Sequence, residues 1–305
     1  MKRLVRNLLI FVCVVVLIDV CYGFVCGYLQ DNAKFGGTAK RMYVAKKSTE
    51  DIMMFGSSRM MHHYVPRVIS DSLGMTCFNA GEDGNCIILA YGYLQMIMKR
   101  HVPKLVIYEI FSYDIKEDDK SKYLSLLKPL CDDPDVKELV CSVFPDERLK
   151  MLSSLYRYNS IMPLLLAANV GGATEYQNGY EPLRGVMDYE PDAPILHEIK
   201  EDTLKLRLIK DFISLCRKHD VPVVFCVSPS YKGYHTDVYD KVKRLCESEG
   251  AYFWNYFDCK EIVNDRSLFQ DQMHMNDAGA RKYTSIVVQR LKDVVLTGGK
   301  RKSNQ

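Results

Sequence analysis

The sequence has no strong excess of charge of either sign. Its 41 lysines and arginines are scattered among 38 acidic residues, which leaves a formal net charge of +3 over 305 residues. It contains no RNA- or DNA-binding motif, and no basic stripe is interleaved with aromatic residues. The sequence therefore predicts no nucleic-acid partner.

The short cysteine and glycine spacings of metal and nucleotide sites are also missing. The eleven cysteines form no CxxC pair and no zinc-like spacing. The stretch "GEDGN", residues 81–85, lacks the remaining glycine spacing of a P-loop or dinucleotide site. His62 and His63 make a poor metal site, because adjacent residues rarely chelate one ion and no carboxylate cluster accompanies them. We therefore predict no cofactor and no metal.

The cysteines themselves are predicted to be buried thiols. Three lie in an apolar N-terminal segment, and Cys226 lies inside the strand-like run "VPVVFCVSPS". Free cysteine in such a position behaves as a small hydrophobic residue. One or two disulfides, involving Cys131 and Cys141, are the alternative interpretation.

An apolar segment near the N-terminus predicts export from the cytoplasm. Residues 8–29 follow three basic residues and contain one charge, Asp19. About 20 apolar residues span a bilayer as a helix, and the basic flank favours a cytoplasmic N-terminus. Asp19 in mid-span costs about 2–3 kcal/mol of insertion free energy. A cleaved signal peptide, with "CYG" at residues 21–23 as the cleavage site, is the alternative. Both interpretations place the remainder in the periplasm or the extracellular space.

Beyond residue 50, short apolar runs alternate with longer amphipathic ones. The alternation favours a parallel sheet covered on both sides, which means a three-layer α/β/α sandwich of flavodoxin type with five strands. The expected strands are residues 51–56, 76–81, 104–111, 222–228 and 251–257. The expected helices are residues 65–73, 86–100, 197–219, 236–249 and 277–296.

The predicted domain organisation follows from these elements. Residues 1–29 are the transmembrane or signal segment, and the polar residues 30–50 are a linker. The catalytic domain covers 51–296, and its long insertion 115–195 leaves the carboxyl end of the third strand, where it would form a lid or substrate wall. The tail 297–305 is predicted to be disordered.

Two polar clusters far apart in the sequence carry candidate chemistry. Ser58 follows the first predicted strand and precedes a helix, a geometry that exposes a hydroxyl above the sheet. Asp271 and His274 stand three residues apart before the last helix, so the carboxylate can hold the imidazole while its other nitrogen faces a nucleophile. After the second strand, Gly81 and Gly84 allow a sharp turn that can aim a backbone N–H into the same site.

These clusters occur in the order found in the SGNH/GDSL hydrolase superfamily. That family has a GDS-like turn after the first strand, Asn-Ala-x-x-x-Gly after the second, and D-x-x-H before the final helix. Here residues 56–58 read GSS, with Ser57 where the family usually has Asp. The chain resembles the superfamily over residues 50–115 and 220–295. The GSS variant followed by Arg59 is similar to exported members that handle acyl groups on cell-surface polymers.

The resemblance implies a role for each matching residue. Ser58 would be the nucleophile, His274 the general base and Asp271 its orienting carboxylate. The backbone N–H groups of Ser58 and Gly84 would form the oxyanion hole.

The chain departs from the family at the third block, Gly-x-Asn-Asp, which should fall at "FSYD", residues 111–114. Tyr113 occupies the asparagine position, so the side-chain oxyanion donor is missing or displaced. Losing one such donor typically costs 10²- to 10³-fold in rate. Asn79 and Asn85 both offer side-chain amides nearby that could take this role. We predict Asn85 as the replacement donor.

Three further side chains are predicted to bind substrate. Arg59, His62 and His63 follow Ser58. Arg59 and one of the two histidines, which we assign as His63, would grip an anionic or sugar group, or else these residues cap a helix and pack on the surface. Tyr231 ends the fourth strand on the same face, where a plain turn is the alternative.

The leading functional hypothesis is an exported, membrane-tethered serine esterase that removes O-acyl groups, most simply O-acetyl, from cell-surface carbohydrate through an acyl-enzyme. An O-acyltransferase that passes the acyl group to a sugar hydroxyl, with a membrane acyl-donor protein as partner, is the second hypothesis. The third is a non-catalytic carbohydrate-binding or assembly protein on the same fold.

Overall fold

The structure is a computed structural model that describes residues 1–172, 178–192 and 200–302, with side chains described up to residue 296. The chain divides into two compact units. Met1–Lys47 and Lys120–Thr174 form the helical unit, and Ser48–Asp119 and Glu175–Gln305 form the sheet unit.

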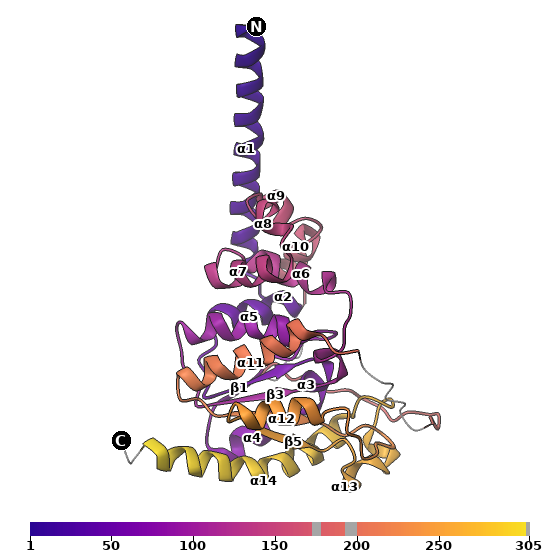
Figure 1. Cartoon of the computed structure of the whole chain (residues 1–305). Helices are drawn as coiled ribbons and strands as arrows, with labels where there is room; N and C mark the ends of the chain where they lie inside the picture. The colour runs from indigo at the N-terminus through magenta and orange to yellow at the C-terminus, as the bar shows by residue number, and fades with distance from the viewer. Residues whose placement is uncertain (173–177, 193–199, 303–305) are drawn as a thin grey trace. The chain divides into compact units, whose positions relative to one another are not determined.

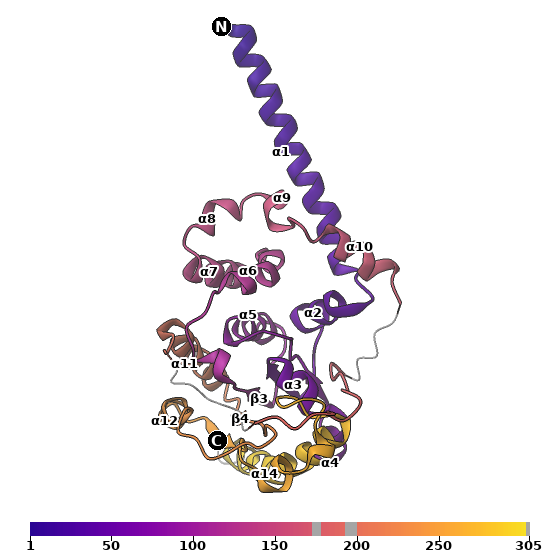
Figure 2. The same cartoon turned by 90° about the vertical axis from the view of Figure 1, so that its right-hand side faces the viewer.

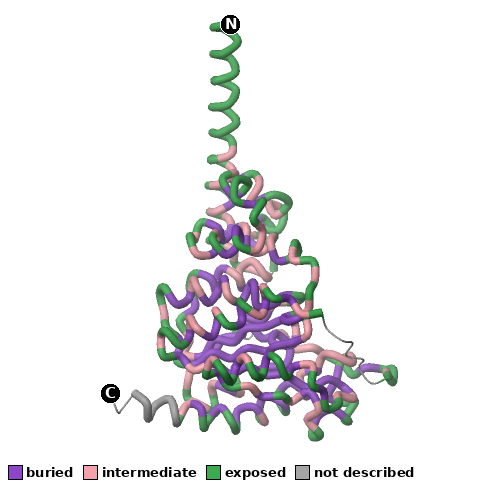
Figure 3. Tube along the Cα trace, viewed as in Figure 1, coloured by how far each residue is buried: buried purple, intermediate pink, exposed green. Residues whose placement is uncertain are grey.

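The sheet unit is built on five parallel strands in the order β2-β1-β3-β4-β5. All residues of β1 to β4 are buried, whereas the edge strand β5 is partly exposed (Figure 3). The strands are β1 Ile52–Gly56, β2 Cys77–Asn79, β3 Leu105–Glu109, β4 Val223–Val227 and β5 Tyr252–Asn255. The predicted parallel five-stranded α/β fold is confirmed, and each strand lies within its predicted range.

Helices cover both faces of this sheet (Figures 1 and 2). On one face lie α5 and α11, where Phe212 of α11 packs its ring against Phe55 and Phe225 of two strands. On the other face lie α4 and α14, where Tyr283 and Val287 share a core with the alternate strand residues. The helices of the unit are α3 Ser58–His63, α4 Pro66–Leu73, α5 Ile87–Met98, α11 Thr203–Lys218, α12 Asp240–Ser248, α13 Lys260–Val263 and α14 Asp277–Lys302, with short 3₁₀ turns η1 Ser112–Asp114 and η3 Arg266–Leu268.

The helical unit contains the N-terminal helix. Its helices are α1 Lys2–Asp31, α2 Gly36–Lys46, α6 Ser121–Leu127, α7 Pro134–Val143, α8 Glu147–Lys150, α9 Ser154–Arg157 and α10 Met162–Val170, with the 3₁₀ turn η2 Lys128–Leu130. By length and composition α1 could cross a membrane, since its most apolar 18-residue window has a mean hydropathy of 2.8 and no part of that window is buried. Figure 3 shows this exposure along the N-terminal part of the helix.

Two predictions, one for the segment 30–50 and one for the tail 297–305, are corrected. Within the predicted linker 30–50, Gly36–Lys46 form α2, which lies beside α1 and α10 in the helical unit and in which Met42, Val44 and Ala45 are buried. The tail predicted to be disordered continues α14 as far as Lys302, and residues 303–305 lie outside the described part of the chain.

The predicted insertion 115–195 is divided between the units. Lys120–Thr174 cluster with the N-terminal helices, and Glu175 onwards clusters with the sheet. That Lys120–Thr174 form a lid stays a prediction.

All eleven cysteines are free thiols, including Cys131 and Cys141, and seven of the eight outside the leader are buried. The buried-thiol interpretation therefore describes these residues, and the alternative disulfide does not form.

Candidate active site

The turn after β1 presents a serine at the carboxyl edge of the sheet. Gly56 has φ +153°, and a Cβ there would lie 2.7 Å from the Glu109 carbonyl oxygen, so the chain can turn only with glycine. Ser57 follows as the extended N-cap of α3, and Ser58 is its first helical residue. At that position a backbone N–H has no acceptor within the helix. Both the hydroxyl and the N–H of Ser58 are therefore available above the sheet.

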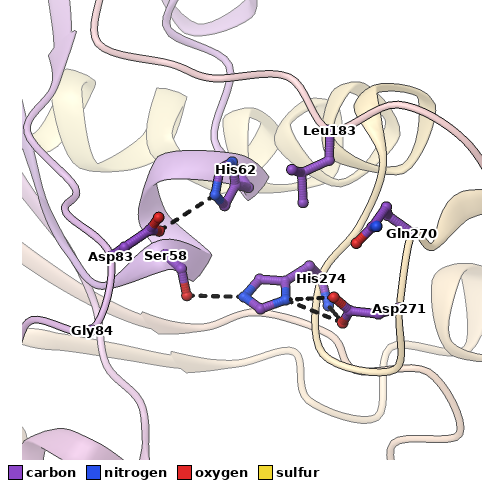
Figure 4. Close-up of a pocket in the computed structure, with 8 residues that line it drawn as sticks. All are labelled: Ser58, His62, Asp83, Gly84, Leu183, Gln270, Asp271 and His274. Carbon is purple, nitrogen blue, oxygen red and sulfur yellow. Dashed lines mark hydrogen bonds and ion pairs between the residues drawn. The ribbon is translucent and has the colours of Figure 1, made fainter. Parts of the chain in front are cut away.

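Ser58, His274 and Asp271 form a continuous hydrogen-bonded chain (Figure 4). The Ser58 Oγ lies 2.9 Å from His274 Nε2. On the other side of the ring, Nδ1 lies 3.1 and 3.0 Å from the two carboxylate oxygens of Asp271. The structure therefore brings together the three side chains that the sequence singled out, across 216 residues between serine and histidine.

The partners determine which ring nitrogen of His274 carries the proton. An ionised carboxylate only accepts hydrogen bonds, so Nδ1–H donates to Asp271 and Nε2 accepts from the Ser58 hydroxyl. Burial alone would raise the pKa of Asp271, but hydrogen bonds from the His274 ring and from the backbone N–H groups of Met273 and His274 lower it below its usual value. This is the protonation state in which imidazole can accept a proton from the serine.

A cavity of about 330 Å³ opens over this chain of hydrogen bonds. Its lining residues are Ser58, His62, Asp83, Gly84, Leu183, Gln270, Asp271 and His274. Among these described residues, Leu183 supplies the one aliphatic side chain, and it comes from the part of the insertion that clusters with the sheet. The walls are otherwise polar or backbone.

Two backbone N–H groups are available to an oxyanion in the cavity. Gly84 has φ +65° in the turn after β2, and its N–H donates to no acceptor among the described residues. The Ser58 N–H is the second donor. Because neither N–H donates a hydrogen bond to another described residue, both can donate to a negatively charged oxygen beside the Ser58 hydroxyl.

Neither asparagine considered as a side-chain oxyanion donor lines the cavity. Asn85, the predicted replacement, donates its amide to the Asp83 carbonyl at 2.9 Å, so its side chain closes its own turn. Asn79 donates to the carbonyls of Met60 and Tyr64 at 2.7 and 2.9 Å and thereby ties α3 to β2. The assignment of Asn85 as an oxyanion donor is corrected, because its side-chain amide already donates to a backbone carbonyl two residues away.

Tyr113, at the third-block position, does not line the cavity either. Tyr113 is 40% exposed, and its ring lies under the Lys116 ammonium. Its neighbour Asp114 is fully buried and accepts from the backbone N–H of Ile87 and from the Tyr108 hydroxyl. Burial raises the pKa of Asp114 to about 6. This position therefore stabilises the loop and the start of α5.

His62 forms a second charged pair in the cavity. Its Nδ1 lies 2.7 Å from the Glu181 carbonyl oxygen, and its Nε2 lies 3.4 Å from a carboxylate oxygen of Asp83. Because both neighbours are acceptors, the ring suits its doubly protonated, cationic form. Burial alone would lower the pKa of His62, but the hydrogen bonds to Asp83 and Glu181 raise it above its usual value. The ring is centred 5.9 Å from that of His274.

Arg59 does not lie at the substrate rim as predicted. Its side chain is 1% exposed and forms an ion pair with Glu109, Nε to Oε1, at 3.2 Å. The guanidinium also donates to the hydroxyl of Ser230 at 2.8 Å and to the carbonyl of Met273 at 3.0 Å. Further donation goes to the carbonyls of Ser228 and Pro229. Five acceptors therefore hold Arg59 beneath the cavity, where it ties the loop of His274 to the ends of β3 and β4.

His63 is likewise a buried structural residue. The backbone N–H of Met275 donates to its Nε2 at 3.0 Å, so its proton is on Nδ1, which donates to the Ser228 hydroxyl at 2.8 Å. That hydroxyl in turn donates to Glu109. Burial and the nearby Arg59 cation hold the pKa of His63 well below its usual value, so the ring is neutral. The predicted contact with substrate is therefore corrected.

Tyr231 lies outside the cavity lining as well. Its hydroxyl donates to Glu190 at 2.9 Å, and its backbone N–H donates to the Gln272 carbonyl. The turn interpretation therefore holds for this residue, which helps to fix the loop before His274.

Sequence reasoning did not assign Glu109, Asp83, Leu183 or Gln270. Glu109 carried a detectable signal, since it is a lone carboxylate that ends the apolar strand "LVIYE". A charge in that position requires a buried partner or a role in a site. The other three residues lie in loops, where nothing in their local sequence indicates which side chain faces the cavity.

Comparisons with known proteins return similarity in structure alone. No protein-family model matches the sequence, and no curated protein does. A Streptococcus pneumonia protein provisionally assigned as a platelet activating factor has a TM-score of 0.40 at 11% identity, over 94% of this chain and 98% of that chain. A variant of an acetyl-xylooligosaccharide esterase from Geobacillus Stearmophilus has a TM-score of 0.39 at 11% identity, over 80% and 94%. A GDSL-like lipase from Bacteroides thetaiotaomicron has a TM-score of 0.34 at 11% identity, over 79% and 88%.

Because the identities and TM-scores are low, the functional proposal depends on the residues and distances in the chain itself.

Proposed function

We propose that the chain is a membrane-anchored serine esterase of SGNH type that removes O-acetyl groups from cell-surface carbohydrate. One observation carries the proposal: the serine hydroxyl, the imidazole and the carboxylate form a hydrogen-bonded chain with links of 2.9 and 3.0 Å on the wall of a cavity. A non-catalytic binding protein would have no need for this arrangement.

In the first half-reaction the Ser58 Oγ attacks the ester carbonyl carbon while His274 Nε2 takes the hydroxyl proton. The carbonyl oxygen becomes an oxyanion, which the N–H groups of Ser58 and Gly84 stabilise. The tetrahedral intermediate then expels the alcohol, which receives the proton from His274, and the acyl group stays on Ser58.

In the second half-reaction a water molecule attacks the acyl-enzyme. His274 removes one proton from the water and returns it to the Ser58 Oγ as the acid leaves. Asp271 stays ionised throughout and stabilises the imidazolium that forms in each half-reaction.

The cavity supports a short acyl group and a polar alcohol. Its volume of about 330 Å³ is at the small end for ligand sites, which run from about 300 to 1,000 Å³. A long acyl chain would require apolar walls, whereas Leu183 is the one aliphatic side chain among the described lining residues. The carboxylates, amide and imidazoles suit the hydroxyl groups of a sugar.

The contacts of α1 support retention of the N-terminal helix as an anchor. Cleavage near Gly23 would remove Asp19, which accepts hydrogen bonds from the start of α9. The following turns of the helix place Cys26 in a small core with Tyr158 and Leu165. A signal peptide has no reason to be built into the folded unit in this way.

The decisive experiment compares two adjacent serines in the full-length detergent-solubilised chain. Ser58→Ala should lower kcat for p-nitrophenyl acetate by about 10⁴-fold or more. Ser57→Ala is the matched control, because Ser57 is buried and its side chain makes no cap hydrogen bond, so its kcat should remain within about threefold of wild type. Equal residual rates in wild type and Ser58→Ala would overturn the proposal.

Two substrate series test the finer assignments. Activity should fall steeply from p-nitrophenyl acetate to the octanoate, and an acetylated oligosaccharide should release free acetate. If acetate instead appears as a mass gain on an added oligosaccharide acceptor, the same acyl-enzyme serves an O-acyltransferase.

A further inference from the structure

The only charge in the apolar part of α1 is bound by another element of the helical unit. Asp19 accepts a hydrogen bond from the Ser153 hydroxyl at 2.6 Å and from the backbone N–H groups of Ser154 and Leu155 at 2.9 and 2.8 Å. These N–H groups belong to the first residues of α9, which have no acceptor within that helix. The carboxylate therefore replaces its water of hydration with three donors.

These three hydrogen bonds hold the start of α9 beside Asp19, part-way along α1. The part of α1 before Asp19, residues 2–18, is about 17 residues long and rises about 25 Å. A bilayer core is about 30 Å thick. A bilayer spanned by α1 would therefore reach at least to Asp19, where α9 is bound.

Helices α8 and α9 and their connection expose leucines. Leu149, Leu152 and Leu155 of α8, α9 and the connection between them are 78%, 70% and 41% exposed. We call these three residues the leucine patch. In both views, α8 and α9 lie nearer to the N-terminal end of α1 than α6, α7 and α2 do (Figures 1 and 2).

We propose that the leucine patch is seated in the outer interface of the bilayer that α1 spans, so that the helical unit is a membrane-surface domain. The patch is continuous with the span through the Asp19 contacts, and this continuity identifies lipid, not a second copy of the chain, as its occupant. Exposed Arg148 and Lys150 flank Leu149, as in interfacial helices whose basic side chains remain at the headgroups. The inference rests on the proposed anchor and is independent of the proposed esterase chemistry.

The test uses tryptophan fluorescence in the full-length chain reconstituted in phosphatidylcholine vesicles. The single native tryptophan, Trp254, is buried in the sheet unit and is replaced by Trp254→Phe. Leu152→Trp is then introduced, and a second variant carries Leu149→Trp. Both should be quenched at least about twofold more by lipids brominated near the headgroup than the control Ser142→Trp, an exposed position on α7.

Three outcomes would overturn the proposal. Strong quenching by aqueous acrylamide without quenching by brominated lipid would place the patch in water. Weak quenching by both reagents, together with crosslinking between chains, would identify a second copy as the occupant. Equal lipid quenching at positions 152 and 142 would remove the patch as the specific contact.

The anchor and the catalytic proposal are monitored separately in the same samples. Flotation of the vesicles in a density gradient tests the anchor: a chain that floats without brominated-lipid quenching defeats the leucine patch alone. Hydrolysis of p-nitrophenyl acetate by each tryptophan variant verifies that the sheet unit is folded, and its absence from wild type would defeat the esterase alone.

Discussion

Arg59 and Glu109 form a fully buried ion pair beneath the candidate active site. Glu109 accepts from Arg59, from the Ser228 N–H and hydroxyl, and from the Tyr64 hydroxyl. Arg59 in turn donates to the Met273 carbonyl next to His274. The pair therefore couples the turn that bears Ser58 to the loop that bears His274, and in the proposed mechanism it acts through positioning.

Removing the cation should leave Glu109 buried and unpaired. Arg59→Met is therefore expected to lower the free energy of unfolding by about 3–5 kcal/mol and to lower kcat, because the loop of His274 loses its donor. Thermal unfolding and p-nitrophenyl acetate kinetics measure the two effects. Arg67→Met is the matched control, since the Arg67–Asp71 pair is exposed and should contribute below about 1 kcal/mol. Equal effects of the two substitutions would contradict the positioning role.

His62 gives the cavity a pH-dependent element. Its pKa is raised in the folded chain by Asp83 and Glu181, against the effect of burial. The pKa of an unfolded histidine is about 6.5, so the stabilisation is complete below that pH and is lost as the pH rises through the higher folded-state pKa. The His62–Asp83 pair thus stabilises the folded state at pH values below neutrality.

Asp83→Asn should therefore lower Tm at about pH 6 and leave it nearly unchanged at about pH 9. The free-energy difference should stay below about 1 kcal/mol, because the Asp83 side chain is 65% exposed and water screens the pair. Asp71→Asn is the comparison, since its partner Arg67 keeps its charge across this range and the effect should not vary with pH. A Tm difference that grows with pH would exclude the His62–Asp83 pair as its cause.

At the scale of elements, the turn after β2 packs closely against α3. A Cβ on Gly81 would lie 2.5 Å from the backbone nitrogen of Met61 and 2.9 Å from the Cβ of Met60. Both atoms belong to α3, which begins with Ser58. The close approach of this turn therefore determines where Ser58 lies.

Gly81→Ala should displace α3 and lower kcat by about 10²-fold, since a shift of about 1 Å in reacting groups has that effect. Gly74→Ala is the control: Gly74 has φ +65° at the end of α4, and a Cβ there would meet no atom within 4 Å, so it should cost about 1 kcal/mol of stability and leave kcat unchanged. Steady-state kinetics beside thermal unfolding separates the two. A Gly81→Ala variant with wild-type kcat would mean that α3 does not depend on this contact.

For the whole molecule, the proposed anchor and the proposed catalytic residues lie in different units of the chain. Ser58, Asp271 and His274 all belong to the sheet unit, whereas α1 belongs to the helical unit. Deleting residues 2–18 removes the exposed apolar segment but keeps Asp19 and the α1 residues that pack against α9 and α10. The deletion should therefore separate membrane attachment from catalysis.

The full-length chain should float with vesicles after a high-salt wash, and the deletion variant should remain in the soluble fraction with kcat within about twofold of wild type, because the anchor lies in the unit without the triad. Intact mass spectrometry of the membrane-bound chain should find residues 1–29 still attached. A mature chain that begins near residue 24 would mean cleavage and would contradict the anchor.

The sequence by itself determined the five strands of the sheet and the three chemical groups. The five parallel strands and the serine, histidine and aspartate follow from local signals: apolar runs, a glycine turn and a D-x-x-H spacing before a helix. Each of these signals is carried by a few neighbouring residues. The residues that follow the strands of a parallel sheet then lie together at its carboxyl edge.

Only the tertiary structure decided which polar side chains face the cavity and which are buried. Arg59 and His63 look like substrate ligands in the sequence, but acceptors 50 to 214 residues away bury them. Likewise, the polar residues 36–46 form helix α2, which lies beside α1 and α10 and in which Met42 and Val44 are buried. A side chain's type is local, whereas the free energy of burying it depends on partners that only folding brings within hydrogen-bonding distance.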